Sequence, residues 1–391
     1  MSRPDEKPAA PLVYLIAGEP SGDQLGARLM TALSAASGGR VRFSGVGGPQ
    51  MEKLGLRSLF SIEELAVMGL VEVLPHLPRL LRRMAQTEAH VRAVQPDLLV
   101  TIDAPGFGLR VAKKLKGAGF PLVHYVAPSV WAWKPGRAKK IAGYLDHLLT
   151  LLPFEPPYFE VHGLKTSFVG HPAIEALDGA GQVGALRQRL GIRADTPLLT
   201  VLPGSRRSEV KRLAPVFGDT VARLVAATPD LEVLLPTVPA VADLVEQHSR
   251  QWAAPVHLLP RVADKYAAFK AGRAALAASG TVAIELAVAQ TPAVIGYRVN
   301  ALTAAIVGYL VKVPFVSIAN LVVQRAVQPE FLQQHCTAEN LSRALLPLMQ
   351  EGPERQAQIA GLKEAVTRLS GAGQGKPSDQ AAKILLGLIP G

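Results

Sequence analysis

Cysteine is nearly absent from this chain of 391 residues, in which Cys336 stands alone. A single cysteine excludes a disulfide framework and a cysteine-based zinc site, and it fits a reducing compartment. Aromatic residues make up only 5% and do not alternate with basic residues. The chain therefore shows no stacking platform for bases, and nucleic acid is the least favoured partner.

Long unbroken apolar runs are also missing. Two segments, 274–297 and 301–323, are apolar enough to suggest a membrane span, but each is interrupted by charged, polar or helix-breaking residues. The interruptions are Gly280, Glu285 and Pro292 in the first, and Lys312, Pro314 and Asn320 in the second. A spanning helix needs about 20 continuous apolar residues, so we expect none. The polar first eleven residues also predict no signal peptide.

Apolar and basic residues are what the chain does contain. Hydrophobic residues make up 49%, which predicts a globular protein, and the length suits two domains. The net charge is +11, from 42 basic and 31 acidic residues. A basic surface favours an acidic partner, which could be nucleic acid, anionic lipid or a phosphorylated substrate.

Apolar strand-like runs alternate with helix-like runs almost throughout. We expect strands at Leu12–Ala17, Val41–Gly45, Leu98–Asp103, Leu122–Val126, His147–Leu152, Ser167–Val169, Leu198–Leu202, Glu232–Leu235, Val256–Leu259, Ala274–Ala278 and Pro292–Tyr297. This rhythm predicts an α/β fold of parallel sheets covered on both faces: two doubly wound, Rossmann-like domains facing across a cleft.

The domain boundaries are expected where the composition changes. Residues 1–172 should form the first domain, 173–192 a linker rich in Gly and Ala, and 193–350 the second domain. Residues 351–391 should form C-terminal helices that pack back on the first domain.

The loop AGEPSGD follows the first expected strand and carries two carboxylates, Glu19 and Asp23. A phosphate would be repelled there, although strand, glycine turn and helix usually cradle one. Capping of the following helix by Ser21 or Asp23 explains part of the loop. It does not explain Glu19, for which we favour a contact with sugar hydroxyls or with a developing positive charge.

Two further loops of the first half carry candidate residues. Asp103 ends the strand of LLVTIDAPGFG, where it is either a turn residue or a general base facing the cleft. Trp131 and Trp133 crowd the loop of HYVAPSVWAWKPGR, where large aromatics usually face a ligand or an interface. We expect His124 to be a buried histidine whose hydrogen bonds are satisfied.

The clearest anion signal lies in LLTVLPGSRRSEV. Gly204 and Ser205 offer backbone N–H groups, and Arg206 and Arg207 follow at a helix start. Cations at a helix N-terminus are unfavourable for the helix, so a bound anion explains them better than structure does. The Walker pattern is absent, and a solvated basic patch remains the alternative.

A second phosphate loop is expected at Ser279, Gly280 and Thr281, which begin a helix after a strand. Glu285 is the only charge in this apolar neighbourhood, and vicinal ribose hydroxyls would suit its carboxylate. The alternative is a helix residue that faces solvent.

Basic, phosphate-like loops thus lie in the second half, and acidic, sugar-like loops lie in the first. This arrangement is expected of a nucleotide-sugar glycosyltransferase. No D-x-D motif occurs, so no metal and no cofactor are indicated. Arg206 and helix N-termini could neutralise a leaving diphosphate instead.

Residues 64–84, ELAVMGLVEVLPHLPRLLRRM, suggest how a lipid substrate could be reached. An apolar stretch with Val67, Met68 and Leu70 precedes a basic helix with Arg79, Arg82 and Arg83. An apolar loop beside a basic helix resembles a membrane-surface contact, although an ordinary core helix explains part of the pattern.

Several of these motifs together resemble the lipid-A-disaccharide synthases, inverting glycosyltransferases of lipopolysaccharide biosynthesis in Gram-negative bacteria. The motifs are AGEPSGD, GVGGPQM, AVMGLVEVL, IDAPGF, HYVAPSVWAWK, LLPFE, FVGHP, LPGSRRSEV and ASGTVAIELA, and they extend from about Tyr14 to about Cys336. The segment SIANLVVQRAVQPEFLQ departs from the family pattern at Ala319 and Ala326.

The resemblance implies a GT-B fold and the condensation of UDP-2,3-diacylglucosamine with 2,3-diacylglucosamine 1-phosphate (lipid X), with release of UDP. It implies that Asp103 is the base for the acceptor 6-hydroxyl, that Arg206 binds the diphosphate and that Glu285 binds the ribose. Glu19 and Ser21 match the first loop of the family, and Asn320 matches a donor-side residue. Trp131 and Trp133 are candidates for acceptor binding.

The resemblance also implies a cytoplasmic enzyme held peripherally at an anionic inner-membrane surface. The sequence leaves a homodimer open. Two other hypotheses stay open as well. One is another GT-B enzyme, such as a UDP-N-acetylglucosamine 2-epimerase, and the other is a non-catalytic nucleotide-binding protein at a membrane surface.

Overall fold

The computed structural model describes residues 10–65, 77–132, 135–179, 182–300, 313–371 and 375–389. Four candidate residues, Val67, Met68, Leu70 and Trp133, lie outside these ranges. Within them, no helix is both long enough and apolar enough to cross a membrane.

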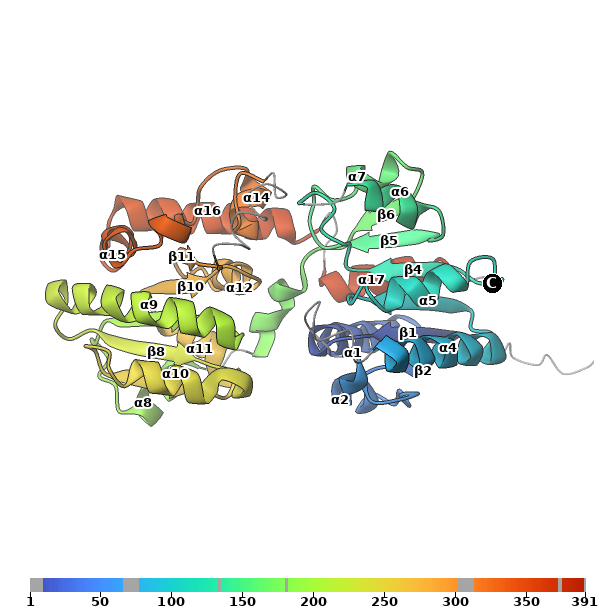
Figure 1. Cartoon of the computed structure of the whole chain (residues 1–391), viewed down its shortest axis with the longest axis horizontal. Coiled ribbons are helices and arrows are strands. Elements are labelled where there is room, and N and C mark those ends of the chain that lie inside the picture. The colour runs from blue at the N-terminus through green and yellow to red at the C-terminus, as the bar shows by residue number, and fades with distance from the viewer. Residues whose placement is uncertain are drawn as a thin grey trace, which may run out of the picture. The chain divides into compact units, whose positions relative to one another are not determined.

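The chain forms two compact units (Figure 1). Unit 1 contains residues 1–172 and 370–391, and unit 2 contains residues 173–369. Unit 1 is therefore built from two separate parts of the sequence.

Unit 1 has a six-stranded parallel sheet in the order β2-β1-β3-β4-β5-β6. The strands are β1 (Leu12–Ala17), β2 (Arg42–Val46), β3 (Leu98–Ile102), β4 (Leu122–Tyr125), β5 (His147–Thr150) and β6 (Lys165–Phe168). All five residues of β3 are buried, which explains why its sequence LLVTI does not alternate between apolar and polar residues.

Helices cover both faces of this sheet (Figure 1). The helices α1 (Pro20–Ala36), α2 (Pro49–Glu52) and α17 (Pro377–Leu386) contribute to one hydrophobic core. A second core involves α4 (Leu77–Val94), α5 (Gly108–Lys114), α6 (Gly136–Ala142) and α7 (Pro157–Glu160). Alternate residues of β1 enter the two cores, because Leu15 belongs to the first and Ile16 to the second.

Unit 2 has a second six-stranded parallel sheet, in the order β12-β11-β10-β7-β8-β9. The strands are β7 (Leu198–Leu202), β8 (Glu232–Pro236), β9 (Val256–Leu259), β10 (Ala274–Ala278), β11 (Ala293–Tyr297) and β12 (Glu330–Leu332). Taken from β9, this order is that of the dinucleotide-binding Rossmann fold.

The helices of unit 2 also form two layers. The helices α9 (Arg207–Ala227), α10 (Ala242–Ser249) and α15 (Ala338–Leu345) pack on one face of the sheet. The helices α8 (Val183–Leu190), α11 (Val262–Ala271), α12 (Val282–Val288), α14 (Ile318–Val323) and α16 (Pro353–Leu369) form the other clusters.

Two expectations about the domain boundaries need correction. Residues 182–192, expected within a linker, contain α8, whose Leu186 packs with Ala267 and Ala268 of α11 in unit 2. Residues 351–369, expected to pack on the first domain, form α16, whose Leu362 packs with Ala319 in unit 2. Of the C-terminal helices, α17 is the one that packs on α1.

Each of the eleven expected strands is present, with ends shifted by up to two residues. The structure adds β12, which the sequence did not predict. This strand is only three residues long, and all three are partly exposed, so no apolar run marks it. It pairs with β11 at the edge of the sheet.

Candidate active site

Both sheets are parallel, and in each the order in which the chain adds strands reverses at one point, called the switch point. In unit 1 it lies between β1 and β3, and in unit 2 between β7 and β10. Ligands of open α/β sheets bind outside the carboxyl ends of the strands at such points. The loops that follow these four strands contain Glu19 and Ser21, Asp103, Arg206, and Ser279. Nine of the thirteen predicted catalytic and substrate-binding residues thus follow strands at the two switch points.

Ser21 and Asp103, 82 positions apart in the chain, are in direct contact in unit 1. The Ser21 hydroxyl donates a hydrogen bond of 3.1 Å to Oδ2 of Asp103. Asp103 is partly exposed, and its backbone N–H donates to the carbonyl of Tyr125 at 2.9 Å. The carboxylate is thus fixed at a strand end while still reachable by a ligand.

The backbone at Asp103 is strained. Asp103 has a φ of 50° and Ala104 a φ of 39°, in the left-handed region that non-glycine residues rarely adopt. Val126, after the neighbouring strand β4, has a φ of 84°, which is more unusual for a β-branched residue. Strained residues cluster at functional sites, and these three lie at the same edge of the sheet.

The AGEPSGD loop packs directly against the Asp103 loop. A Cβ on Gly18 would lie 2.5 Å from Cβ of Ala104, so glycine is required by this close approach. Glu19 is the N-cap of α1, but its side chain makes no cap hydrogen bond. Glu19 is half-buried and precedes Ser21 by two positions in this loop.

Asp23 has a different role from either of those considered for it. Its carboxylate is 4% exposed and accepts three hydrogen bonds, from the backbone N–H groups of Gly48 (2.9 Å), Gln50 (2.9 Å) and Met51 (3.0 Å). Asp23 therefore caps α2 and not its own helix α1. Three backbone N–H groups of unit 1 therefore use this carboxylate, and the presence of Asp23 in the loop needs no ligand to explain it.

His124 on β4 is buried as expected, but only one of its two ring nitrogens has a partner among the described residues. Nδ1 lies 2.7 Å from the Thr101 hydroxyl, while Nε2 is buried without a hydrogen bond. Burial, together with the positive charge of Arg137, lowers the pKa of His124 to about 3. The ring is therefore neutral near pH 7.

Trp131 is anchored to the body of unit 1. Its indole Nε1 donates to Oε1 of Glu155 at 3.2 Å, and its ring meets Phe154 edge-on at 5.2 Å. The other oxygen of Glu155 accepts from the backbone N–H groups of Leu151 and Leu152. Burial raises the pKa of the Glu155 carboxyl to about 7. Glu155, which the sequence did not single out, thus fixes the loop that carries the candidate acceptor residues.

In unit 2, the loop from Gly204 to Arg206 leaves β7 and enters α9. Gly204 has a φ of 119°, and Ser205 and Arg206 are exposed. The Glu209 carboxylate accepts from the backbone N–H groups of Ser205 (3.2 Å) and Arg206 (3.3 Å) and from the Arg206 guanidinium (3.3 Å). The Ser205 and Arg206 donors expected for a diphosphate are therefore engaged by a carboxylate of the chain itself.

Glu285 lies on α12, after the Ser279–Thr281 turn. It is neither isolated nor simply solvent-facing: its Oε1 accepts from Lys265 Nζ at 2.7 Å and from the Tyr266 hydroxyl at 2.8 Å. Its side chain is 17% exposed. Ser279 is half-buried, and Gly280 and Thr281 are exposed, at the carboxyl end of β10. Lys265 thus neutralises the charge that was expected to need a partner.

Asn320 is fully buried in α14 and makes four internal hydrogen bonds. Its Nδ2 donates to the Gln328 carbonyl and to Glu330 Oε1, and its Oδ1 accepts from the N–H groups of Val327 and Gln328. An amide has no further capacity beyond these bonds. Asn320 therefore shapes the 327–330 segment, and any influence on a ligand is exerted through that segment.

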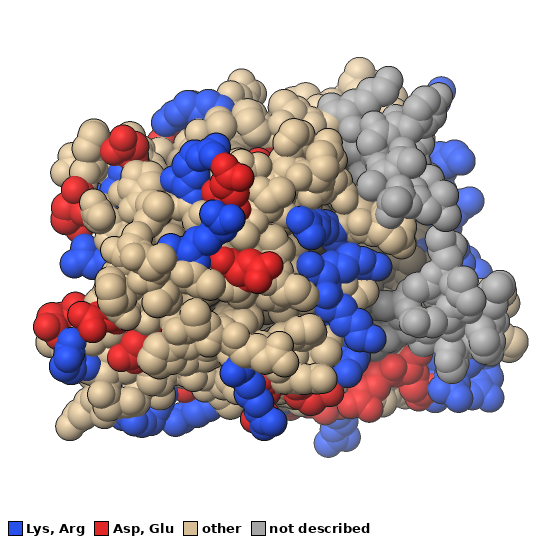
Figure 2. Space-filling model, turned by 60° about the vertical axis from the view of Figure 1, so that its left-hand side comes forward, with Lys and Arg blue, Asp and Glu red and all other residues tan. Residues whose placement is uncertain are grey.

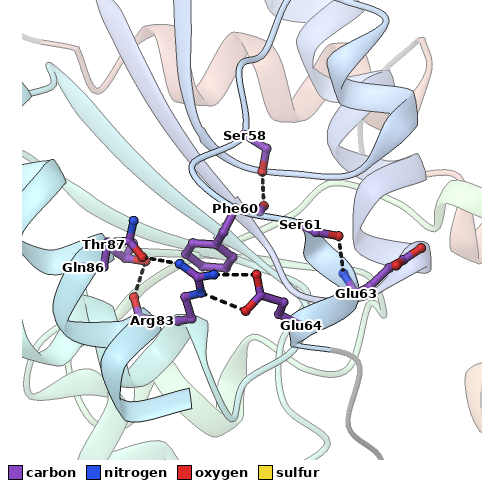
Figure 3. A network of polar contacts seen from close by, with 8 residues as sticks. All are labelled: Ser58, Phe60, Ser61, Glu63, Glu64, Arg83, Gln86 and Thr87. Atoms are coloured by element: carbon purple, nitrogen blue, oxygen red, sulfur yellow. Dashed lines mark hydrogen bonds and ion pairs between the residues drawn. The ribbon is translucent and has the colours of Figure 1, made fainter. Parts of the chain in front are cut away.

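Two of the three candidate arginines of α4 are exposed, whereas the third is bound inside unit 1. Leu77, Arg79, Leu81 and Arg82 are exposed, with Leu81 at 52%. Arg83 is instead held by Glu64 through two hydrogen bonds of 2.6 and 2.9 Å, and it lies over the Phe60 ring (Figure 3). The bond from Arg83 also lowers the pKa of Glu64. Arg83 is thus an internal bridge, unlike Arg79 and Arg82.

Three residues with a bearing on the site were missed in the sequence: Glu209, Lys265 and Glu155. An acidic residue in the first turn of a helix is a common capping pattern, and this signal was available for Glu209. No local pattern marks the other two, because Lys265 reaches Glu285 from another helix, and the Glu155 partner Trp131 is 24 positions away.

Two parallel α/β sheets, each with candidate ligand loops at its switch point, place the chain in the GT-B-like class of glycosyltransferase folds. Solved structures agree. The Staphylococcus aureus MnaA-UDP co-structure matches with a TM-score of 0.65 at 14% identity, covering 97% of this chain and 98% of that one. Acinetobacter baumannii MurG matches with a TM-score of 0.58 at 13% identity, covering 96% and 99%. At these identities the likeness concerns the fold.

Sequence comparison is more specific. The family model described as lipid-A-disaccharide synthetase matches residues 13–385. The lipid-A-disaccharide synthase of Rhodospirillum centenum is 52% identical over 380 residues, covering 97% of this chain and 94% of the relative. That of Paramagnetospirillum magneticum is 49% identical, covering 97% of each. The chain belongs to the lipid-A-disaccharide synthetase family, and its activity is that of a glycosyltransferase of lipid A biosynthesis.

Proposed function

We propose that the chain joins UDP-2,3-diacylglucosamine to 2,3-diacylglucosamine 1-phosphate in one direct displacement, with Asp103 as the base. The observation that carries this proposal is the Ser21–Asp103 contact at the switch point of unit 1. It holds a partly exposed carboxylate on a rigid strand end, which is the position a general base requires.

In the reaction, the acceptor 6-hydroxyl gives its proton to Asp103 as its oxygen attacks the anomeric carbon of the donor sugar. The bond between that carbon and the diphosphate oxygen breaks, and UDP leaves with the electron pair. Attack from the face opposite UDP inverts the anomeric configuration and gives a β-1,6 linkage. Ser21 orients the carboxylate, and Glu19 is placed to accept bonds from acceptor hydroxyls.

On the donor side, Arg206 and the N–H groups of Gly204 and Ser205 receive the diphosphate, with the Ser279–Thr281 turn as a second source of N–H donors. Donors directed at a leaving group stabilise the charge that develops on it. Glu285 Oε1 is already bonded to Lys265 and Tyr266. We therefore assign the ribose hydroxyls to its second oxygen, Oε2. Asn320 acts by positioning the 327–330 segment.

The test is UDP release by the purified protein from UDP-2,3-diacylglucosamine, with and without the monosaccharide 1-phosphate acceptor. Release that requires the acceptor supports the transfer. Donor turnover without acceptor would instead indicate epimerase or hydrolase chemistry, and UDP binding without any turnover would indicate a non-catalytic binding protein.

We further propose that the α4 face docks on an anionic membrane surface, on the cytoplasmic side, where both acylated substrates would lie. Leu77 and Leu81 are four residues apart, so they share one side of α4, and both are exposed, as are Arg79 and Arg82 of the same helix. Apolar side chains that can enter the headgroup region, flanked by cations, are typical of a membrane-surface helix. Val67, Met68 and Leu70 precede this helix in the sequence and belong to the same proposal.

The double replacement Arg79→Ser/Arg82→Ser should weaken binding to vesicles that contain anionic lipid by about 30-fold, because each cation near such a surface contributes about 1 kcal/mol. Replacing Leu77 and Leu81 by Ser, or Val67, Met68 and Leu70 by Ser, should also weaken it. Vesicle co-sedimentation measures the effect. Val161→Ser is the matched control, because Val161 is 74% exposed elsewhere on unit 1. If the arginine and apolar variants of this segment bound vesicles as well as the wild-type protein and Val161→Ser do, the proposal would be contradicted.

A further inference from the structure

The carboxylate of Glu209 is the meeting point of four donors. Its Oε2 accepts the N–H groups of Ser205 and Arg206, and its Oε1 accepts from Arg206 Nη1 and from the Tyr297 hydroxyl, all at 3.2–3.3 Å. Three of these four donors are the ones proposed above to receive a diphosphate. A diphosphate oxygen and the Glu209 carboxylate cannot both occupy the same N–H groups.

The contacts of Glu209 are long for the charge they carry. Hydrogen bonds to a carboxylate are usually about 2.7–2.9 Å from a charged N–H group and about 2.5–2.7 Å from a hydroxyl. The bonds from the Arg206 guanidinium and the Tyr297 hydroxyl, both 3.3 Å, are longer than this. The side-chain donors to Glu285 are closer, at 2.7 Å from Lys265 and 2.8 Å from Tyr266. The bonds from the Arg206 and Tyr297 side chains hold the Glu209 carboxylate in place but can be exchanged for stronger ones at little cost.

The surroundings of Glu209 are strongly cationic. A cavity of about 350 Å³ beside it is lined by Arg206, Arg212, Arg298 and Tyr297, and Glu209 is the acidic residue of the lining. The guanidinium of Arg298 donates from Nη2 to the Cys336 carbonyl, and its Nε is buried without a hydrogen-bond partner among the described residues. Basic side chains also gather in groups on the face of the molecule drawn in Figure 2.

The charges of this cavity fit a diphosphate better than they fit Glu209. The described lining contains three arginines and one glutamate, so it carries an excess of positive charge. A nucleoside diphosphate brings two to three negative charges, which match the arginines once Glu209 has withdrawn. With Glu209 in place, the same diphosphate would meet a like charge at contact distance.

We propose that Glu209 is an internal competitor of the nucleoside diphosphate, which leaves the Ser205, Arg206 and Tyr297 donors when the diphosphate binds and returns when it departs. This inference rests on the proposed function, since it concerns the same donor loop. Its consequence is that Glu209 weakens the binding of the UDP product and so speeds product release.

The test is the dissociation constant of UDP for the wild-type protein and for Glu209→Gln, by titration calorimetry at one salt concentration. The single amide oxygen of glutamine can keep the two backbone N–H bonds that Oε2 accepts at the start of α9, so the helix start is kept. The charge is lost, and with it the bond from Arg206 Nη1 to Oε1. We expect UDP to bind about tenfold more tightly to Glu209→Gln, the effect of removing one like-charge contact near the surface. Uridine, which lacks the diphosphate, should bind equally to both proteins.

Asp243→Asn is the matched control, because the Asp243 carboxylate pairs with Arg207 at 2.8 Å on the same unit and touches none of these donors. Its UDP affinity should change less than twofold. Glu209→Asp is a second variant, in which the charge is kept but the side chain is too short to reach the donors. Its UDP affinity should lie between that of the wild-type protein and that of Glu209→Gln.

Unchanged or weaker UDP binding in a folded Glu209→Gln protein would overturn the inference, as would equal tightening for UDP and uridine. Equal tightening in Asp243→Asn would also overturn it, because any lost carboxylate would then suffice. If UDP binds to the wild-type protein but Glu209→Gln has no effect, only this inference fails. If UDP binds to neither, the proposed donor site fails with it.

Discussion

Replacement of Asp103 by Asn should lower the turnover number by about 10²–10⁴-fold, the range that a positioned general base supplies, while UDP affinity stays the same. Asn has the size of Asp, and it tolerates the left-handed backbone that Asp103 adopts better than most residues do. Its amide oxygen can still accept the Ser21 hydrogen bond. The variant should therefore fold normally and lack only the ability to take a proton.

Ser21→Ala separates the orientation of Asp103 from its basicity. It removes the 3.1 Å hydrogen bond but leaves the carboxylate, so the loss of turnover should be much smaller than in Asp103→Asn. Initial rates at saturating donor and acceptor measure both variants, and calorimetry with UDP checks the donor site. Near-normal turnover of Asp103→Asn would remove Asp103 from the role of base.

Replacement of Asp23 by Ala should lower the free energy of unfolding by about 2–4 kcal/mol, because it leaves three N–H groups at the start of α2 without their acceptor. Two of these bonds are buried, so water cannot easily substitute. Thermal unfolding followed by circular dichroism measures the loss. UDP affinity should not change, because the donor loops belong to unit 2.

Asp23→Asn is the matched variant for this prediction. Its single oxygen can keep the bonds from Gly48 and Met51, whereas its amide group would face the N–H of Gln50. Its loss of stability should therefore be intermediate. If instead both variants unfolded like the wild type but bound the acceptor poorly, Asp23 would be a substrate ligand, as its place in AGEPSGD first suggested.

The strands and the residues that follow them could be predicted from the sequence. The strands were predictable, because buried parallel strands are continuous apolar runs, and their order along the chain locates the loops at strand ends. Asp103 and Arg206 follow such strands and were found in this way. β12 was not found, because three partly exposed residues carry no such pattern.

The partners of the side chains were harder to predict than their positions. Asp23 bonds to residues 25 to 28 positions away, and Lys265 reaches Glu285 from the preceding helix. Asn320 was expected to bind the donor, but its side-chain amide makes all four of its hydrogen bonds within unit 2. Such contacts depend on how loops distant in sequence meet, and composition and periodicity do not contain that information.

The position of α17 has a consequence for how the chain is made. Ala381, Ala382 and Leu385 complete the same core as Leu29 and Leu33 of α1. During synthesis this apolar face of unit 1 stays uncovered until Pro377–Leu386 has left the ribosome. Unit 2, which is contiguous in sequence, can finish folding earlier. A premature stop codon shortly before residue 377 would thus harm the half of the protein that was translated first.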